Sequence, residues 1–119
     1  MNRRDLGSFG EEQAAKYLRR KGYTLVGMNY RCRQGEIDLI VRGRGCIVFV
    51  EVKLRRDERF AQAREFVTRA MQERILTTAQ LWLSENETGL QPRFDVIEIY
   101  APAGADGPIR IEHIENAFS

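Results

Sequence analysis

Apolar residues alternate with other residues along two short runs that a glycine-containing segment separates. Both runs lie within residues 35–53, which read GEIDLIVRGRGCIVFVEVK. A period of two predicts two strands joined as a hairpin. Four charged side chains, Glu36, Asp38, Glu51 and Lys53, occupy strand positions, although such residues are depleted in strands and are rarely buried without a partner. These charges therefore need a structural or a functional explanation.

Helix and strand patterns lie on both sides of this hairpin. An apolar stripe at helical spacing predicts a helix over residues 8–21, and Ser8 and Glu11 have the S-x-x-E form of a capping box at its start. A longer stripe, which includes Trp82 as an expected core residue, predicts a helix over residues 62–84. The other expected elements are strands at residues 23–31, 93–100 and 109–114, with a loop at 101–108. The order α-β-β-β-α-β-β indicates one domain, residues 1–119, in which helices pack on a single sheet.

The turn of the hairpin fixes the expected pairing of its two strands. Gly43 and Arg44 are predicted to form a two-residue type II′ turn, which favours glycine at its first position. This turn pairs Arg42 with Gly45. Because side chains alternate between the faces of a strand, one face is expected to be entirely apolar and to carry Ile37, Leu39, Val41, Val48, Val50 and Val52. All four charges then lie on the opposite face, at the end remote from the turn.

Two of these charges form a pair that needs either a proton or a cation. Asp38 and Glu51 are diagonal neighbours in the expected pairing, within reach of each other. Two carboxylates about 5 Å apart repel by roughly 3 kcal/mol at an effective dielectric constant near 20. A proton or a metal ion reduces this repulsion, and Mg²⁺ binds one or two carboxylates together with water and phosphate oxygens. With Lys53 on the same face, the pattern predicts metal-assisted hydrolysis of a phosphodiester.

Composition and charge restrict the other classes of function. The chain has 119 residues and a net charge of +2, which allows a nucleic-acid partner without requiring one. The single histidine, His113, argues against a zinc site of the usual His/Cys kind. Cys32 and Cys46 form no CxxC motif and fit a reducing compartment. No apolar run reaches membrane-spanning length, so we expect a cytoplasmic protein without a membrane partner.

The charged strand positions also resemble a known motif. GEIDLI at residues 35–40, followed by FVEVK at residues 49–53, resembles the D…E-x-K signature of the PD-(D/E)XK nuclease superfamily. More closely, the chain resembles the YraN-type family of endonuclease-like proteins, which are similar in fold to archaeal Holliday-junction resolvases. The resemblance covers nearly the whole chain and includes Gly10-Glu11, Gly22-Tyr23, Asn29-Tyr30-Arg31, Arg55 and Arg93-Phe94-Asp95-Val96. It implies an α/β, restriction-endonuclease-like core with a central mixed sheet, DNA (branched DNA included) as substrate, and a homodimer.

The resemblance also implies roles for individual residues. Asp38 and Glu51 would bind Mg²⁺ or Mn²⁺, Lys53 would orient or activate the water, and Glu11 would be an additional acidic ligand. A capping-box role is the alternative for Glu11. The chain departs from the family at Met71, where a lysine is frequent, and at Ala61, where a glycine is frequent.

Further residues near the motif are candidates for supporting roles. Glu36 and Gln34 are expected beside the metal ligands, and a solvated strand end is the alternative for Glu36. Five basic residues are candidates for contacts with a phosphate backbone, with a solvated basic rim as the alternative: Arg31, Arg33, Arg55, Arg56 and Arg59. Three functions stay open, namely a Mg²⁺-dependent DNA endonuclease, a non-catalytic nucleic-acid-binding module, and a protein-interaction domain with a vestigial site.

Overall fold

Within the part of the chain that the structure describes, one mixed sheet and two helices make up the fold. The computed structural model describes residues 3–56 and 67–119. Its elements are α1 (Arg3–Arg20), β1 (Thr24–Cys32), β2 (Gly35–Gly43), β3 (Cys46–Arg55), α2 (Arg69–Glu85), β4 (Gln91–Tyr100), the 3₁₀ turn η3 (Gly104–Asp106) and β5 (Arg110–Phe118). The strand order is β1-β2-β3-β4-β5, with β3 and β4 parallel and the other neighbours antiparallel. This confirms the predicted order and the nuclease-like α/β fold.

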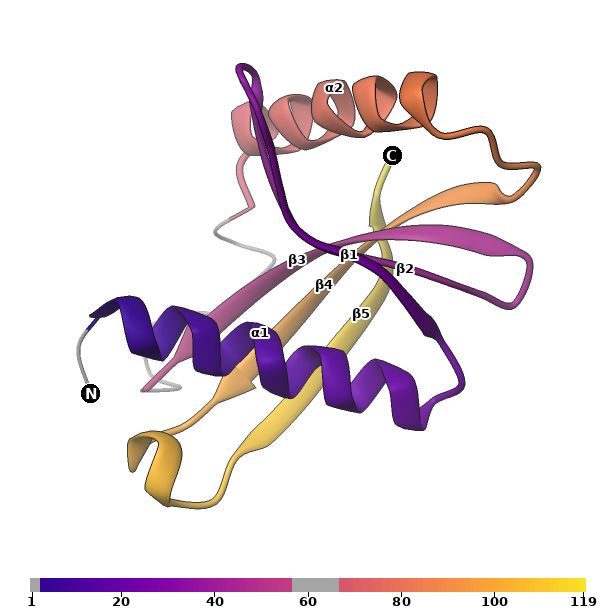
Figure 1. Ribbon diagram of the computed structural model, residues 1–119. Helices are drawn as coiled ribbons and strands as arrows, with labels where there is room; N and C mark the ends of the chain where they lie inside the picture. The colour runs from indigo at the N-terminus through magenta and orange to yellow at the C-terminus, as the bar shows by residue number, and fades with distance from the viewer. Residues whose placement is uncertain (1–2, 57–66) are drawn as a thin grey trace.

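The two helices cover opposite faces of the sheet (Figure 1). On one face, Ala14 and Leu18 of α1 pack against the valines and leucines of β2 and β3. On the other face, Trp82 of α2 meets Phe49 of β3 edge to face, with ring centroids 5.7 Å apart. Trp82 is therefore a core residue, as predicted. Within the described residues, neither helix is long and apolar enough to cross a membrane.

Both helices start at other residues than the sequence predicted. Because α1 begins at Arg3, Ser8 and Glu11 lie inside the helix and the expected capping box is wrong. A serine in a helix interior costs less than about 0.7 kcal/mol, so the S-x-x-E pattern does not require a helix start. The N-cap of α2 is Thr68, whose side chain accepts a hydrogen bond from the Met71 amide at 3.2 Å. Residues 62–66 of the helix predicted over 62–84 lie outside the described residues.

The last strand is longer than the sequence predicted. β5 continues to Phe118, whereas the alternating pattern ended at residue 114. The Phe118 ring stacks on the ring of Phe94 in β4, with centroids 5.4 Å apart. This aromatic contact holds the strand end in place.

The turn between β2 and β3 lies at Arg44 and Gly45. Their φ angles of 55° and 78° are both positive, which identifies a type I′ turn rather than the predicted type II′ turn. The ladder pairs Gly43 with Cys46, so the expected pairing of Arg42 with Gly45 is wrong. Gly43 belongs to the strand for a different reason. A side chain there would place its Cβ 2.8 Å from the Tyr23 ring.

Replacing Gly45 with alanine is expected to lower the free energy of unfolding by about 1–2 kcal/mol, because a Cβ is disfavoured in the left-handed region. No atom lies within 4 Å of the added Cβ, so the loss reports backbone conformation alone. Gly89→Ala is the matched control, since Gly89 also has open space and has no positive φ. Urea denaturation measures both variants, and equal losses would contradict the assigned turn.

β2 separates from β3 at Asp38. The ladder between these strands runs only from Gly43 to Leu39 on the β2 side. Beyond it, Asp38 Oδ2 accepts a hydrogen bond from the Val52 amide at 2.8 Å, so a side chain replaces a strand partner. Ile37 consequently packs on the α2 side, whereas Leu39 packs on the α1 side. The prediction that Ile37 and Leu39 share a face is wrong because Asp38 interrupts the alternation.

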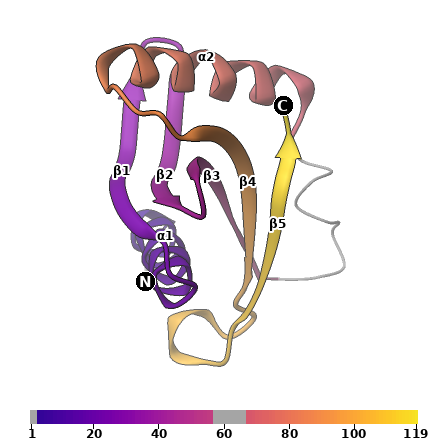
Figure 2. The same cartoon turned by 90° about the vertical axis from the view of Figure 1, so that its right-hand side faces the viewer.

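The separation produces a fork between the β1–β2 hairpin and β3. In both views the tip of the hairpin reaches α2, while β3 stays in the sheet beside β4 (Figures 1 and 2). Glu36 and Asp38 lie on the hairpin arm of this fork, and Glu51 and Lys53 lie on the β3 arm.

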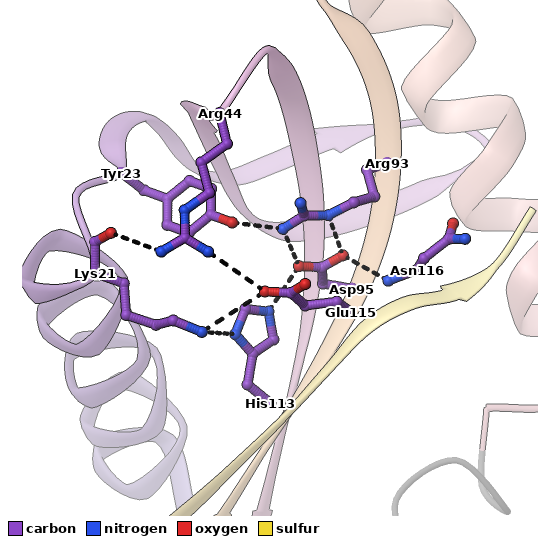
Figure 3. A network of polar contacts seen from close by, with 8 residues as sticks. All are labelled: Lys21, Tyr23, Arg44, Arg93, Asp95, His113, Glu115 and Asn116. Carbon is purple, nitrogen blue, oxygen red and sulfur yellow. Dashed lines mark hydrogen bonds and ion pairs between the residues drawn. The ribbon is translucent and has the colours of Figure 1, made fainter.

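A buried polar network fastens β4 to β5 and to the end of α1 (Figure 3). Asp95 is fully buried and accepts hydrogen bonds from Arg93 at 2.8 Å and 2.9 Å, from His113 Nε2 at 2.6 Å and from the Asn116 amide at 3.0 Å. Burial alone would raise the pKa of Asp95, but the bonds from His113, Arg93 and Asn116 lower it. Arg93 also donates to the Tyr23 hydroxyl at 2.7 Å. His113 is thus a satisfied residue of an edge strand.

Candidate metal and phosphodiester site

Three carboxylates meet at the fork. Glu11 comes from α1, and Glu36 and Asp38 come from β2. One oxygen of each lies within 4.8 Å of the others. Two ligands on opposite sides of Mg²⁺ are about 4 Å apart, so small side-chain movements bring this set around one ion. The donor chemistry and the spacing therefore fit a hard divalent cation.

Glu51 and Lys53 form an ion pair on β3, which is the other arm of the fork. Lys53 Nζ lies 3.1 Å from Glu51 Oε1, and the two side chains are only 21% and 14% exposed. Because the pair is mostly shielded from water, salt screens it weakly. Glu51 thus contacts the Lys53 ammonium and also repels the Asp38 carboxylate.

The pKa of Asp38 reflects the carboxylates that surround it. The pKa of Asp38 is raised to about 8, first by burial and next by repulsion from Glu51. Glu11 and Glu36 raise it further, and the hydrogen bond from the Val52 amide acts in the opposite direction. At neutral pH the metal-free site therefore keeps a proton on Asp38, and a bound cation would take over the role of that proton.

The predicted acidic residues gather at the fork in a different arrangement from the one expected. Glu36, predicted to lie beside the ligands, is a member of the group of three oxygens, together with Glu11 and Asp38. Glu51 is not a member of that group and acts on Asp38 through repulsion from the opposite arm. Gln34 lines the same cavity as Glu36 and Glu51. The roles of these residues in metal binding and catalysis stay predictions.

Of the five predicted phosphate-binding arginines, Arg59 lies outside the described residues, and the other four divide into two groups. Arg31 Nε lies 3.2 Å from Glu36 Oε1 in an exposed ion pair, and Arg33 lines the cavity at the fork. Arg55 ends β3 beside Tyr100, and the exposed Arg56 follows it near Gly104. The structure thus brings Arg31 and Arg33 to the fork, while Arg55 and Arg56 lie at the far end of β3.

One basic residue at the fork was absent from the sequence-based set. Arg74 of α2 lines the cavity together with Met71 and Ile75. Residues three apart on a helix share a face, so the spacing of Arg74 from Met71 was a usable signal. The apolar stripe of α2, however, indicated only how the helix packs on the sheet.

The chain is similar to known proteins over its full length. Residues 10–99 match the uncharacterised protein family UPF0102. A UPF0102 protein of Caldanaerobacter subterraneus is 42% identical over 119 residues, with 99% of this chain and 98% of that protein covered. A UPF0102 protein of Symbiobacterium thermophilum is 44% identical with the same coverage. A UPF0102 protein of Vibrio parahaemolyticus is 42% identical over 120 residues, covering 99% of this chain and 95% of that protein. The family match includes every acidic residue of the fork.

Proposed function

The chain belongs to protein family UPF0102, and we propose that it is a metal-dependent endonuclease that hydrolyses phosphodiester bonds of DNA with Mg²⁺ or Mn²⁺. The observation that carries the proposal is the group of Glu11, Glu36 and Asp38 oxygens within 4.8 Å of one another. Glu51, which pairs with Lys53 on β3, adds a further negative charge that acts on Asp38. Carboxylates that repel one another favour a divalent cation, and the Lys53 ammonium suits an anionic substrate. The unlinked thiols of Cys32 and Cys46 suit action in the cytoplasm.

Each side chain has a distinct part in this proposal. The cation would be held by Glu11, Glu36 and Asp38. Glu51 would add a fourth negative charge near Asp38. When bound, Mg²⁺ polarises a phosphoryl oxygen and lowers the pKa of a water molecule. The Val52 amide fixes the orientation of the Asp38 carboxylate. Lys53 supplies positive charge for the phosphate and a donor that orients the attacking water, so no covalent intermediate is needed.

A cleavage assay with three kinds of DNA tests the proposal. Supercoiled plasmid, single-stranded DNA and a four-way junction are incubated with the purified chain in Mg²⁺, in Mn²⁺ and in EDTA. We expect cutting of DNA with either metal and none in EDTA. Cutting that persists in EDTA would contradict the metal role. Salt-sensitive binding without cutting would instead select a non-catalytic binding module, and no binding at all would select a protein-interaction domain.

A further inference from the structure

A cavity of about 410 Å³ opens at the fork, between the tip of the β1–β2 hairpin and α2. Arg33 and Gln34 line it from the hairpin, Glu51 from β3, and Met71 and Arg74 from α2. A second cavity of about 480 Å³ shares Gln34 and Arg74 with the first. The two cavities therefore continue past Arg74 along the surface of α2.

The walls of this cavity are fixed by close packing of the hairpin on α2. A Cβ at Gly35 would lie 3.1 Å from Thr78 Oγ1 and 3.5 Å from Arg74 Cβ, so the backbone of the hairpin tip lies close against the helix and a side chain there would be tightly packed. The Cys32 thiol donates to Thr78 Oγ1 at 3.6 Å, and Thr78 donates to the Arg74 carbonyl at 2.7 Å. Because Thr78 is fully buried, this contact fixes the position of the hairpin tip relative to α2.

The lining of the cavity has an acidic, a basic and an apolar part. Glu36 and Glu51 supply carboxylates, whereas Arg33 and Arg74 supply guanidinium groups. Met71 and Ile75 add apolar surface. A ligand that suits all three parts carries one phosphate near the carboxylates and their cation, another near the arginines, and a base or sugar between them. Arginine binds phosphate through paired hydrogen bonds.

We propose that this cavity receives an unpaired strand of DNA next to the bond to be cut, with Arg74 and Arg33 binding the adjacent phosphate. This inference rests on the proposed nuclease function and specifies its substrate. A volume of about 410 Å³ falls in the range of small-ligand sites, roughly 300–1,000 Å³, which accommodates a nucleotide. An unpaired strand offers the faces of its bases to the apolar surface of Met71 and Ile75, whereas in a duplex these faces are covered by stacking on neighbouring bases.

Binding to tailed and blunt duplexes tests the inference without requiring cleavage. Fluorescence anisotropy is measured in an Asp38→Asn background with a blunt duplex and with the same duplex carrying a short single-stranded tail. We expect tighter binding of the tailed duplex. Arg74→Ala should weaken binding of the tailed DNA about tenfold, the size expected for one lost charge-assisted hydrogen bond. It should leave the blunt duplex unaffected, and Arg74→Lys should restore part of the loss.

Arg69→Ala is the matched control, because Arg69 lies on the same helix, is 93% exposed and does not line either cavity. Equal affinity for both duplexes, or a tailed preference that survives Arg74→Ala, would overturn the inference. If wild type still cuts DNA in that case, the proposed nuclease function stands. Failure to bind or cut any DNA would refute the proposed function and the inference together.

Discussion

Glu51→Gln and Asp38→Asn are each expected to reduce metal-dependent DNA cleavage by at least about 10³-fold, since a cation that stabilises the transition state contributes several kcal/mol. Both substitutions keep the size of the side chain and remove a negative charge at the fork. Rates are measured on the best DNA substrate at saturating Mg²⁺. Glu115→Gln is the matched control, because Glu115 pairs with Lys21 and Arg44 at the end of α1, away from the fork. Its rate should equal that of wild type.

Titration with metal separates the roles within the site. The loss in a ligand variant should be partly recovered at high Mn²⁺, because weaker metal binding is part of the defect. Lys53→Gln should also lose activity, by about 10²–10⁴-fold if Lys53 orients the water, and higher metal should not recover it. Cleavage by the Glu51→Gln variant at the wild-type rate would show that Glu51 takes no part in catalysis. The proposed contribution of this β3 residue to the site would then be wrong.

The sequence allowed the sheet to be predicted because period-two alternation is a local property of each strand. The same local reasoning misplaced the β2–β3 turn. Gly43 appeared to be a turn residue, yet it is glycine because Tyr23, far away in sequence, packs against it. The turn instead uses Gly45, whose positive φ is the feature that a type I′ turn requires. The presence of a glycine in the sequence does not show whether it is needed for close packing or for a positive φ angle.

The arrangement of the site was less accessible, because it depends on contacts between distant segments. Asp38 ends the β2–β3 ladder by binding the Val52 amide, and no periodic pattern encodes such a side-chain bond. Glu36 and Asp38 belong to the part of β2 beyond the end of the ladder, and there they lie near Glu11 of α1. Arg74 lines the same cavity as the tip of the β1–β2 hairpin, which contacts α2 through Cys32 and Thr78. The sequence thus identified most of the charged residues without predicting how they group.

Stability of the metal-free protein is expected to fall as pH rises from about 4 to about 8. The folded-state pKa of Asp38 is raised to about 8 from an ordinary value of 3.8, so in this window the folded chain keeps a proton that the unfolded chain releases. The free energy of unfolding then decreases by at most about 1.4 kcal/mol per pH unit, because folding requires proton uptake. The stabilisation that the folded chain gains by keeping the proton on Asp38 is fully present below pH 4 and is lost above pH 8. Urea denaturation in EDTA at several pH values measures it.

The Asp38→Asn variant isolates this contribution from the titration of other groups. Its amide oxygen can still accept the Val52 hydrogen bond, but it carries no charge for Glu51, Glu11 and Glu36 to repel. At pH 8 in EDTA the variant should therefore be more stable than wild type, and at pH 4 the two should be equal. Mn²⁺ should stabilise wild type at pH 8, by about 2.7 kcal/mol at a concentration 100 times its dissociation constant, and should stabilise the variant less. A variant less stable than wild type at pH 8 would mean that Asp38 forms a structural salt bridge, because only an attractive partner makes its charge favourable there.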